Sequence, residues 1–201
     1  MKTDAFEAFV ARYISLGPLR KHLLRTHLRP VRFQAGETIL HQGDTCHRLL
    51  FITRGVARSM ILLENGREET WDFHYYDPDA PPPRLFLVDF ESFLRQTPAS
   101  LHIEALTETE ALAIDRSARS GLLARSFGFY AFDAAMAREA YCYAHRQLIM
   151  RRTLDPLERY RRFLAEYAPI IPHIPQYQIA SWLGITPQHL SRLKKETDSH
   201  M

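Results

Sequence analysis

The spacing of apolar residues divides the chain into a helical start, a strand-rich middle and a helical end. Phe6, Phe9 and Val10 recur at helical spacing, which predicts a helix over 4–16 and a second over 19–28. From residue 31 onward, glycines separate short runs rich in Ile, Leu, Val, Phe and Thr, as in an all-β sandwich or roll.

One hairpin and one loop can be placed within the strand-rich part. Asn65-Gly66 lies between the strand-like runs 57–63 and 68–73, and a two-residue turn with positive φ favours that pair. The proline-rich segment 75–84 suits neither a helix interior nor a central strand, so it is predicted to be a surface loop.

Two helices are predicted over 117–153, and the second is long. One of its stripes repeats every 3.5 residues, which is typical of helices packed along their length. We predict that this stripe forms a dimer interface of Phe132, Met136, Ala140, Tyr143, Gln147 and Met150. A second face carries Ala137, Tyr141, Ala144 and Leu148, so we expect the helix to contact both its own β domain and a partner chain. A stripe alone does not show which chain covers it, and burial within one chain stays an alternative.

The segment 175–196 has the pattern of a helix-turn-helix. A helix from Pro175 is broken at Gly184, and Thr186 as N-cap with Pro187 in the first turn starts a second helix. Two helices that cross this closely need a small residue at the crossing, a glycine in the turn and an inward apolar set. The predicted core is Ile179, Ala180, Leu183, Gly184, Ile185, Leu190 and Leu193.

The opposite face of the second helix is polar, with the chemistry for reading bases. Arginine can form a bidentate contact with guanine and glutamine with adenine, whereas lysine suits phosphate or guanine. The predicted DNA-binding residues are Thr186, Gln188, Ser191, Arg192, Lys194 and Lys195. An ordinary solvated helical hairpin is the alternative.

Composition and charge agree with a globular nucleic-acid-binding protein. Hydrophobic residues make up 46% and charged residues 24% of the 201, and the chain has neither a membrane-length apolar run nor a secretory pattern, so a cytoplasmic location is expected. The net charge is +3, and the positive balance lies after residue 145, with nine Lys/Arg against five Asp/Glu. Cys46 and Cys142 have no companion at metal-ligand spacing, so no metal or cofactor is predicted.

The chain resembles the Crp/Fnr family of bacterial transcription regulators. The resemblance rests on Ala35 to Asp44 (AGETILHQGD), Phe51 to Gly55 (FITRG) and Ile174 to Pro187 (IPQYQIASWLGITP). It implies an α+β fold with an N-terminal antiparallel β-roll, a long dimerisation helix and a C-terminal helix-turn-helix, here without an evident wing. With the helix start at Asp155-Pro156, the expected domains are 1–120, 121–154 and 155–201.

The resemblance also implies partners. They are double-stranded DNA, a second copy of the chain forming a homodimer, and RNA polymerase, with a small-molecule effector left open and no membrane. Cyclic-nucleotide-binding members carry a Gly-Glu pair and a phosphate-neutralising arginine, but the corresponding stretch 87–105 has no Gly-Glu, and Ala99 stands at the arginine position. We therefore expect that cyclic AMP is not the effector, since a buried phosphate without a cation is strongly disfavoured.

Two other functions are weighed against this one. A cupin-like metal-dependent enzyme would share the roll, but the histidines show no His-x-His pair with a following Glu. A roll that serves as a protein-interaction module tethering the DNA-binding part also fits the sequence. No nucleophile elbow or phosphate loop is present, so the chain is not expected to be an enzyme.

Overall fold

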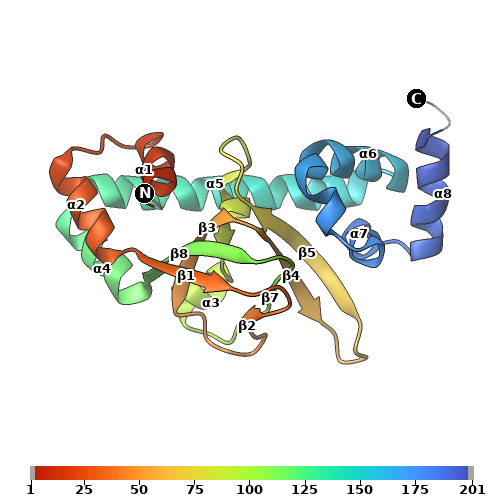
Figure 1. Ribbon diagram of the computed structural model, residues 1–201, viewed down its shortest axis with the longest axis horizontal. Helices are drawn as coiled ribbons and strands as arrows, with labels where there is room; N and C mark the ends of the chain where they lie inside the picture. The colour runs from red at the N-terminus through yellow and green to blue at the C-terminus, as the bar shows by residue number, and fades with distance from the viewer. Residues whose placement is uncertain (1–2, 199–201) are drawn as a thin grey trace.

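The computed structural model describes residues 3–198, in which a β-roll is flanked by helices on one side and at both ends (Figure 1). Its strands form two four-stranded antiparallel sheets, ordered β1-β8-β3-β6 and β2-β7-β4-β5. The strands are β1 (Arg29–Phe33), β2 (Thr38–Leu40), β3 (Arg48–Arg54), β4 (Val56–Leu62), β5 (Glu68–Tyr75), β6 (Phe86–Leu87), β7 (His102–Ala105) and β8 (Thr109–Asp115). The predicted α+β class with an antiparallel roll is confirmed.

Eight α-helices and two short 3-10 helices complete the described chain. They are α1 (Asp4–Ala11), α2 (Pro18–His27), η1 (Pro82–Leu85), α3 (Phe90–Arg95), α4 (Arg116–Arg125), α5 (Phe127–Thr153), α6 (Pro156–Tyr167), η2 (Ala168–His173), α7 (Gln176–Leu183) and α8 (Pro187–Asp198). The first helix is shorter than predicted and ends at Ala11. Residue 121, the expected start of the dimerisation segment, lies within α4 rather than at the start of α5.

The hairpin joining β4 and β5 has the predicted position but a different turn. The Leu63 amide donates to the Arg67 carbonyl at 2.9 Å, and the Gly66 amide donates to the Leu63 carbonyl at 2.9 Å, so the loop holds three residues. Gly66 has φ +79°, whereas Asn65 does not have positive φ. This is a type I turn followed by a left-handed glycine, so the expected two-residue turn is wrong.

Gly55 makes the sharp connection between β3 and β4. Its φ is +90°, and a Cβ at this position would lie 2.4 Å from the Glu108 carbonyl oxygen. Only glycine tolerates both conditions, which explains why this position interrupts the apolar pattern.

The segment 75–84 is only partly a surface loop. Residues 78–79 are exposed, but the chain then turns inward as η1, and the Arg84 side chain is only 2% exposed. The expectation of a wholly exposed loop is wrong, because prolines bar regular helices and central strands but do not bar burial of a 3-10 turn against α5.

Helix α5 runs along the molecule from the N-terminal helices to the C-terminal helices (Figure 1). Its 27 residues give it a length of about 40 Å at 1.5 Å per residue. At one end it packs with α1 and α2 around an aromatic cluster that includes Phe6, Phe9 and Phe51. At the other end α6, α7 and α8 form a helical unit.

Candidate nucleic-acid interface and sensor cavity

The turn between α7 and α8 has the geometry expected of a helix-turn-helix. Gly184 ends α7 with φ +69°, and the Ile185 amide donates to the Ala180 carbonyl at 3.0 Å, which closes the helix end. The Thr186 hydroxyl then accepts from the His189 amide at 3.2 Å and caps α8. Local sequence signals therefore explain both helix boundaries.

Six of the seven residues predicted to form the core face inward, together with aromatic residues that the sequence did not single out, and Gly184 is exposed in the turn. Ile179, Ala180, Leu183, Leu190 and Leu193 are buried, and Ile185 is half-buried. They share one cluster with the buried residues Phe163, Tyr167 and Trp182. The Trp182 ring lies 5.2 Å from Phe163 and 5.6 Å from Tyr167, so α6 supports the crossing of α7 and α8.

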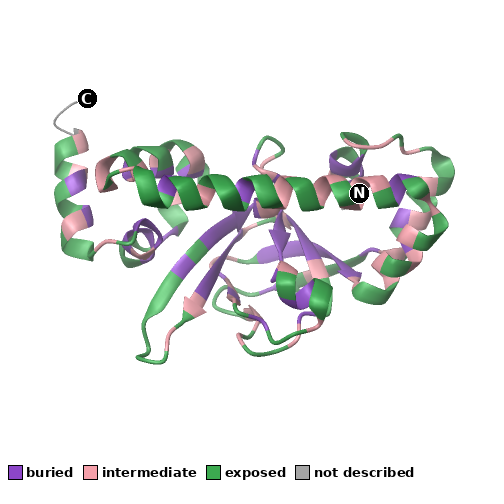
Figure 2. Ribbon diagram, turned by 180° about the vertical axis from the view of Figure 1, so that it is seen from behind, coloured by how far each residue is buried: buried purple, intermediate pink, exposed green. Residues whose placement is uncertain are grey.

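The polar face of α8 points away from this core. Thr186, Gln188, Ser191, Arg192 and Lys195 are exposed, and Lys194 is half-buried. Helix α8 is the element farthest from the N-terminal helices, and its outer side is open along its length (Figures 1 and 2). Residues 156–198 are helical apart from short connections. The described part of this unit thus contains no strand that could form a wing.

The first helix of the pair is bound to the roll. The Ser181 hydroxyl accepts from the Thr70 amide at 2.8 Å and donates to the Glu68 carbonyl at 3.0 Å. Strand β5 is the last strand of its sheet, so α7 covers an edge that would otherwise present unpaired backbone groups. The helical unit is therefore joined to the sensor-like part by hydrogen bonds as well as by apolar packing.

The stripe of α5 predicted as the dimer interface faces its own chain, which corrects that prediction. Tyr143 and Met150 are 8% and 6% exposed. Phe132 and Met136 pack against the N-terminal core, the side-chain oxygen of Gln147 is buried, and Ala140 lines the cavity described below. A 3.5-residue repeat identifies a packed face but not the chain that covers it, and here the roll and its flanking helices cover it.

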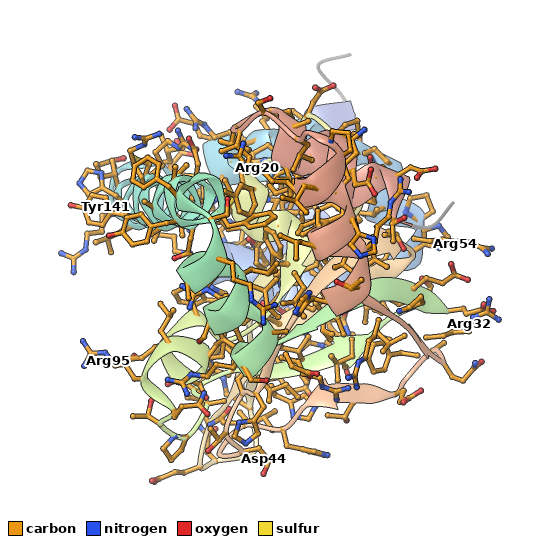
Figure 3. The ribbon with its side chains drawn as sticks, turned by 90° about the vertical axis from the view of Figure 1, so that its left-hand side faces the viewer. Arg20, Arg32, Asp44, Arg54, Arg95 and Tyr141 are labelled. Carbon is orange, nitrogen blue, oxygen red and sulfur yellow. The ribbon has the colours of Figure 1, made fainter. Side chains whose placement is uncertain are left out.

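The opposite side of α5 carries a second repeat that is exposed. We call it the outer seam; it alternates in steps of three and four residues and comprises Phe127, Tyr130, Ala134, Ala137, Tyr141, Ala144 and Leu148. Phe127 is 83% and Tyr141 71% exposed. Figure 2 shows this exposed side of α5, and in Figure 3 Tyr141 points outward from it.

A cavity of about 430 Å³ lies between the roll and α5. In the sheet its wall includes Ser59, Asp72 and His74, and on α5 it includes Tyr143 and Gln147. Burial lowers the pKa of His74, so its imidazole is neutral near pH 7. The His74 ring bonds to the Ser59 hydroxyl at 2.9 Å and to the Arg84 carbonyl at 3.3 Å.

A carboxylate lies at the edge of the cavity, beside the position that the resemblance assigns to a phosphate-binding arginine. Asp89 is buried and accepts from three backbone amides: Ser92 at 2.9 Å, Ser100 at 2.8 Å and Leu101 at 3.0 Å. Ala99 is buried and has no charge to offer. Arg95 lies nearby in the sequence but points to solvent (Figure 3). The backbone amides at this edge therefore already donate to a carboxylate of the protein, that of Asp89.

A buried polar cluster connects the cavity wall with α5 and α6. Asp72 on β5 accepts from the hydroxyls of Tyr143 and Tyr167, and Arg84 donates to the Tyr143 hydroxyl at 2.9 Å and to Glu166 at 2.5 Å. Burial and then the charge of Asp72 raise the pKa of both tyrosines well above the usual value. Burial lowers the pKa of Arg84, but the surrounding acidic groups raise it on balance.

This cluster was not predicted from the sequence. Asp72 stands within a strand-like run and Arg84 at the end of the proline-rich segment, so neither position has a local signal that would predict burial. Charged residues are almost never fully buried unless they are paired. The five side chains of the cluster come from β5, η1, α5 and α6, and only the fold brings these segments together.

No group of three or more His, Cys, Asp or Glu within residues 3–198 is arranged to hold a metal ion. None of the helices described is long and apolar enough to cross a membrane.

Comparison with known proteins shows what the roll is similar to. Residues 30–126 match the family model of the cyclic nucleotide-binding domain. The chain as a whole has the fold of the Crp/Fnr transcriptional regulators, as the resemblance implied. No curated protein matches the sequence.

Three solved structures illustrate the shared fold. FixK2 from Bradyrhizobium japonicum is 18% identical, with 86% of this chain and 85% of that chain covered and a TM-score of 0.67. The c-di-GMP responsive global regulator CLP from Xanthomonas campestris is 14% identical, with 90% and 91% covered and a TM-score of 0.66. A transcriptional regulator of the crp/fnr family from Eubacterium rectale is 21% identical, with 92% and 85% covered and a TM-score of 0.67.

Proposed function

We propose that the protein is a sequence-specific DNA-binding transcriptional regulator that acts as a homodimer on a pseudo-palindromic site. The observation that carries the proposal is the α7–α8 pair, whose apolar side is buried while the polar side of its second helix is exposed. A recognition helix of this kind enters the major groove, with its first turns nearest the bases. RNA polymerase is a partner that the resemblance suggests.

Arg192 is the residue assigned to direct base readout. It is exposed on α8, and a guanidinium reads guanine through two parallel hydrogen bonds. After the preferred site has been selected from random DNA, Arg192→Ala should weaken binding by about 1–3 kcal/mol and relax the preference at one base pair per half-site. Unchanged affinity and unchanged base preference in a mobility-shift series would show that Arg192 does not read the DNA sequence.

A matched control is available on the roll. Arg54 is exposed and points to solvent, so Arg54→Ala removes the same charge away from α8 and should leave binding nearly unchanged (Figure 3). Lys194→Ala and Lys195→Ala should instead weaken binding to all sequences and lower the salt slope by about 1 each, as expected for phosphate contacts. The three outcomes separate base readout from phosphate contact and from loss of net charge.

The outer seam is the surface proposed to join two copies. A coiled coil needs apolar residues spaced alternately by three and four, and the seam supplies seven of them on one exposed face. A parallel pair would place the two α8 helices on the same side of the dimer, where half-sites about 34 Å apart could be read together.

The oligomeric state tests this surface directly. Tyr141→Glu places two charges at the proposed contact and should convert the dimer to a monomer in analytical ultracentrifugation. Tyr177→Glu makes the same change at an exposed tyrosine of α7 and should leave the dimer intact. A Tyr141→Glu protein that sediments as a dimer would contradict the assignment of the seam.

The roll is proposed not to bind cyclic nucleotides. Ala99 cannot neutralise a phosphate, and the Asp89 carboxylate already accepts from the Ser100 and Leu101 amides. A phosphate placed there would meet a like charge in a buried position. Calorimetric titration with cyclic AMP and cyclic GMP should therefore show no binding, and micromolar affinity for either compound would refute this part of the proposal.

A further inference from the structure

The cavity between the roll and α5 has a wall that is mainly apolar and aromatic. Trp71 on β5, Phe86 on β6 and Phe90 on α3 contribute rings to it. The Arg151 guanidinium lies over the Trp71 ring at 5.4 Å, so one face of this ring already receives a cation. A small ligand with an aromatic ring matches this wall.

The charged groups around the cavity are mostly acidic. Three carboxylates line it, those of Asp72, Asp89 and Glu91, against the single guanidinium of Arg151. Arg84 and two tyrosine hydroxyls compensate Asp72, whereas Asp89 accepts hydrogen bonds from backbone amides, which carry no full charge. The cavity therefore disfavours anions and favours a positive charge on the ligand.

The hydrogen-bonding groups point to the same chemistry. Gln147 lines the cavity, and its side-chain oxygen is buried without a hydrogen-bond partner. The Glu91 carboxylate lies on the exposed side of α3 and forms a 3.9 Å ion pair with Arg95. Both groups are acceptors, so a ligand that donates hydrogen bonds would satisfy them.

We propose that this cavity binds a small arylalkylamine, that is, a ligand with one aromatic ring and a protonated amino group, and that it rejects the carboxylate of the same size. The ring lies among Trp71, Phe86 and Phe90, and the ammonium group lies toward Glu91 and Gln147. The amides that would serve an anion remain occupied by Asp89.

The cavity is placed so that its occupant can influence both the dimer and the DNA-binding unit. Ala144 and Leu148 line the cavity and also belong to the outer seam. Asp72 in the cavity wall bonds to Tyr143 on α5 and Tyr167 on α6. Any effect on DNA binding rests on the proposed function, but ligand binding itself does not.

The test is calorimetric titration of the full chain, without DNA and at low salt, with two probes of equal length and opposite charge. Phenethylamine should bind with a dissociation constant below about 1 mM, and phenylacetate should bind at least tenfold more weakly. Equal affinity, preference for the carboxylate, or no binding of phenethylamine at 10 mM would each overturn the proposal.

Variants locate the site. Glu91→Gln removes an exposed charge at the cavity and should reduce the preference for phenethylamine about threefold. Leu101→Trp fills part of the cavity and should abolish binding, whereas Leu62→Trp, at an exposed position of β4, should not. If circular dichroism shows that Leu101→Trp is unfolded, tryptophan fluorescence replaces it as the test. Phenethylamine should quench the fluorescence of the wild-type chain, and this quenching should be lost in Trp71→Phe. Quenching that persists in Trp71→Phe would contradict the proposed site.

These measurements distinguish failure of the cavity proposal from failure of the proposed function. If the chain binds phenethylamine but no DNA, the cavity proposal stands and the proposed regulatory function fails. If the chain binds its selected DNA site but neither probe, the proposed regulatory function stands and the cavity proposal fails.

Discussion

Replacing Tyr143 by phenylalanine tests whether the buried polar cluster holds α5 against the roll. The hydroxyl donates to Asp72 at 2.5 Å and accepts from Arg84 at 2.9 Å, and both partners are buried and charged. Hydrogen bonds to charged groups contribute about 1.5–3 kcal/mol each. Asp72 keeps the Tyr167 hydroxyl and Arg84 keeps Glu166, so we expect the free energy of unfolding to fall by about 2–4 kcal/mol rather than by the full sum.

Equilibrium unfolding in urea measures this loss, at one protein concentration because a dimer's stability depends on concentration. Trp182 lies 5.6 Å from Tyr167, so its fluorescence reports on this end of the molecule. Tyr167→Phe, which removes one bond to Asp72, should cost less than Tyr143→Phe. Tyr177→Phe removes a hydroxyl that accepts one neutral hydrogen bond, from the Gln178 side-chain amide at 3.2 Å, and should change stability by less than about 1.5 kcal/mol. If Tyr143→Phe behaves like Tyr177→Phe, the cluster does not stabilise the fold as argued.

Three further predictions concern pH and helix ends. Burial lowers the pKa of His74 below 6.5, so the unfolded chain binds the proton more readily than the folded chain. The free energy of unfolding should therefore fall as the pH drops below about 6.5, by up to about 1.4 kcal/mol per pH unit. The fall should be less steep in His74→Gln than in the control His47→Gln, which changes an exposed histidine. Gly184→Ala, at φ +69°, should cost about 1–2 kcal/mol in urea unfolding, and Gly17→Ala, at φ −69°, much less. Asp155→Ala should cost about 1 kcal/mol in the same assay by removing the cap on the Glu158 amide.

The helix-turn-helix could be predicted from the sequence because its signals are local. Gly184, Thr186 and Pro187 act through backbone conformation and capping within a few residues of where they stand. The inward residues follow from the helical period once the boundaries are known. The Asp155 cap at the start of α6 was predictable for the same reason.

The face of α5 that meets a partner could not be predicted in this way. Two apolar stripes run along the helix with the same period, and periodicity indicates that a face is covered but not which chain or element covers it. The structure turns the stripe with Tyr143 and Met150 inward and leaves the stripe with Tyr141 and Leu148 exposed. The choice depends on where the roll lies, which is a property of the whole chain.

The sequence by itself determined the helix boundaries at Asp155, Gly184 and Thr186 and the polar face of α8, because these depend on neighbours within one or two turns. The class of the fold followed from the resemblance to the Crp/Fnr family. Tertiary structure alone decided that η1 is buried, that Arg84 meets Asp72 and two tyrosines, and that the Asp89 carboxylate occupies the amides beside the cavity. A buried charge is tolerated only when it has partners, and here distant segments supply them. The pattern of hydrophobic and polar positions along the sequence does not show which distant segments will meet.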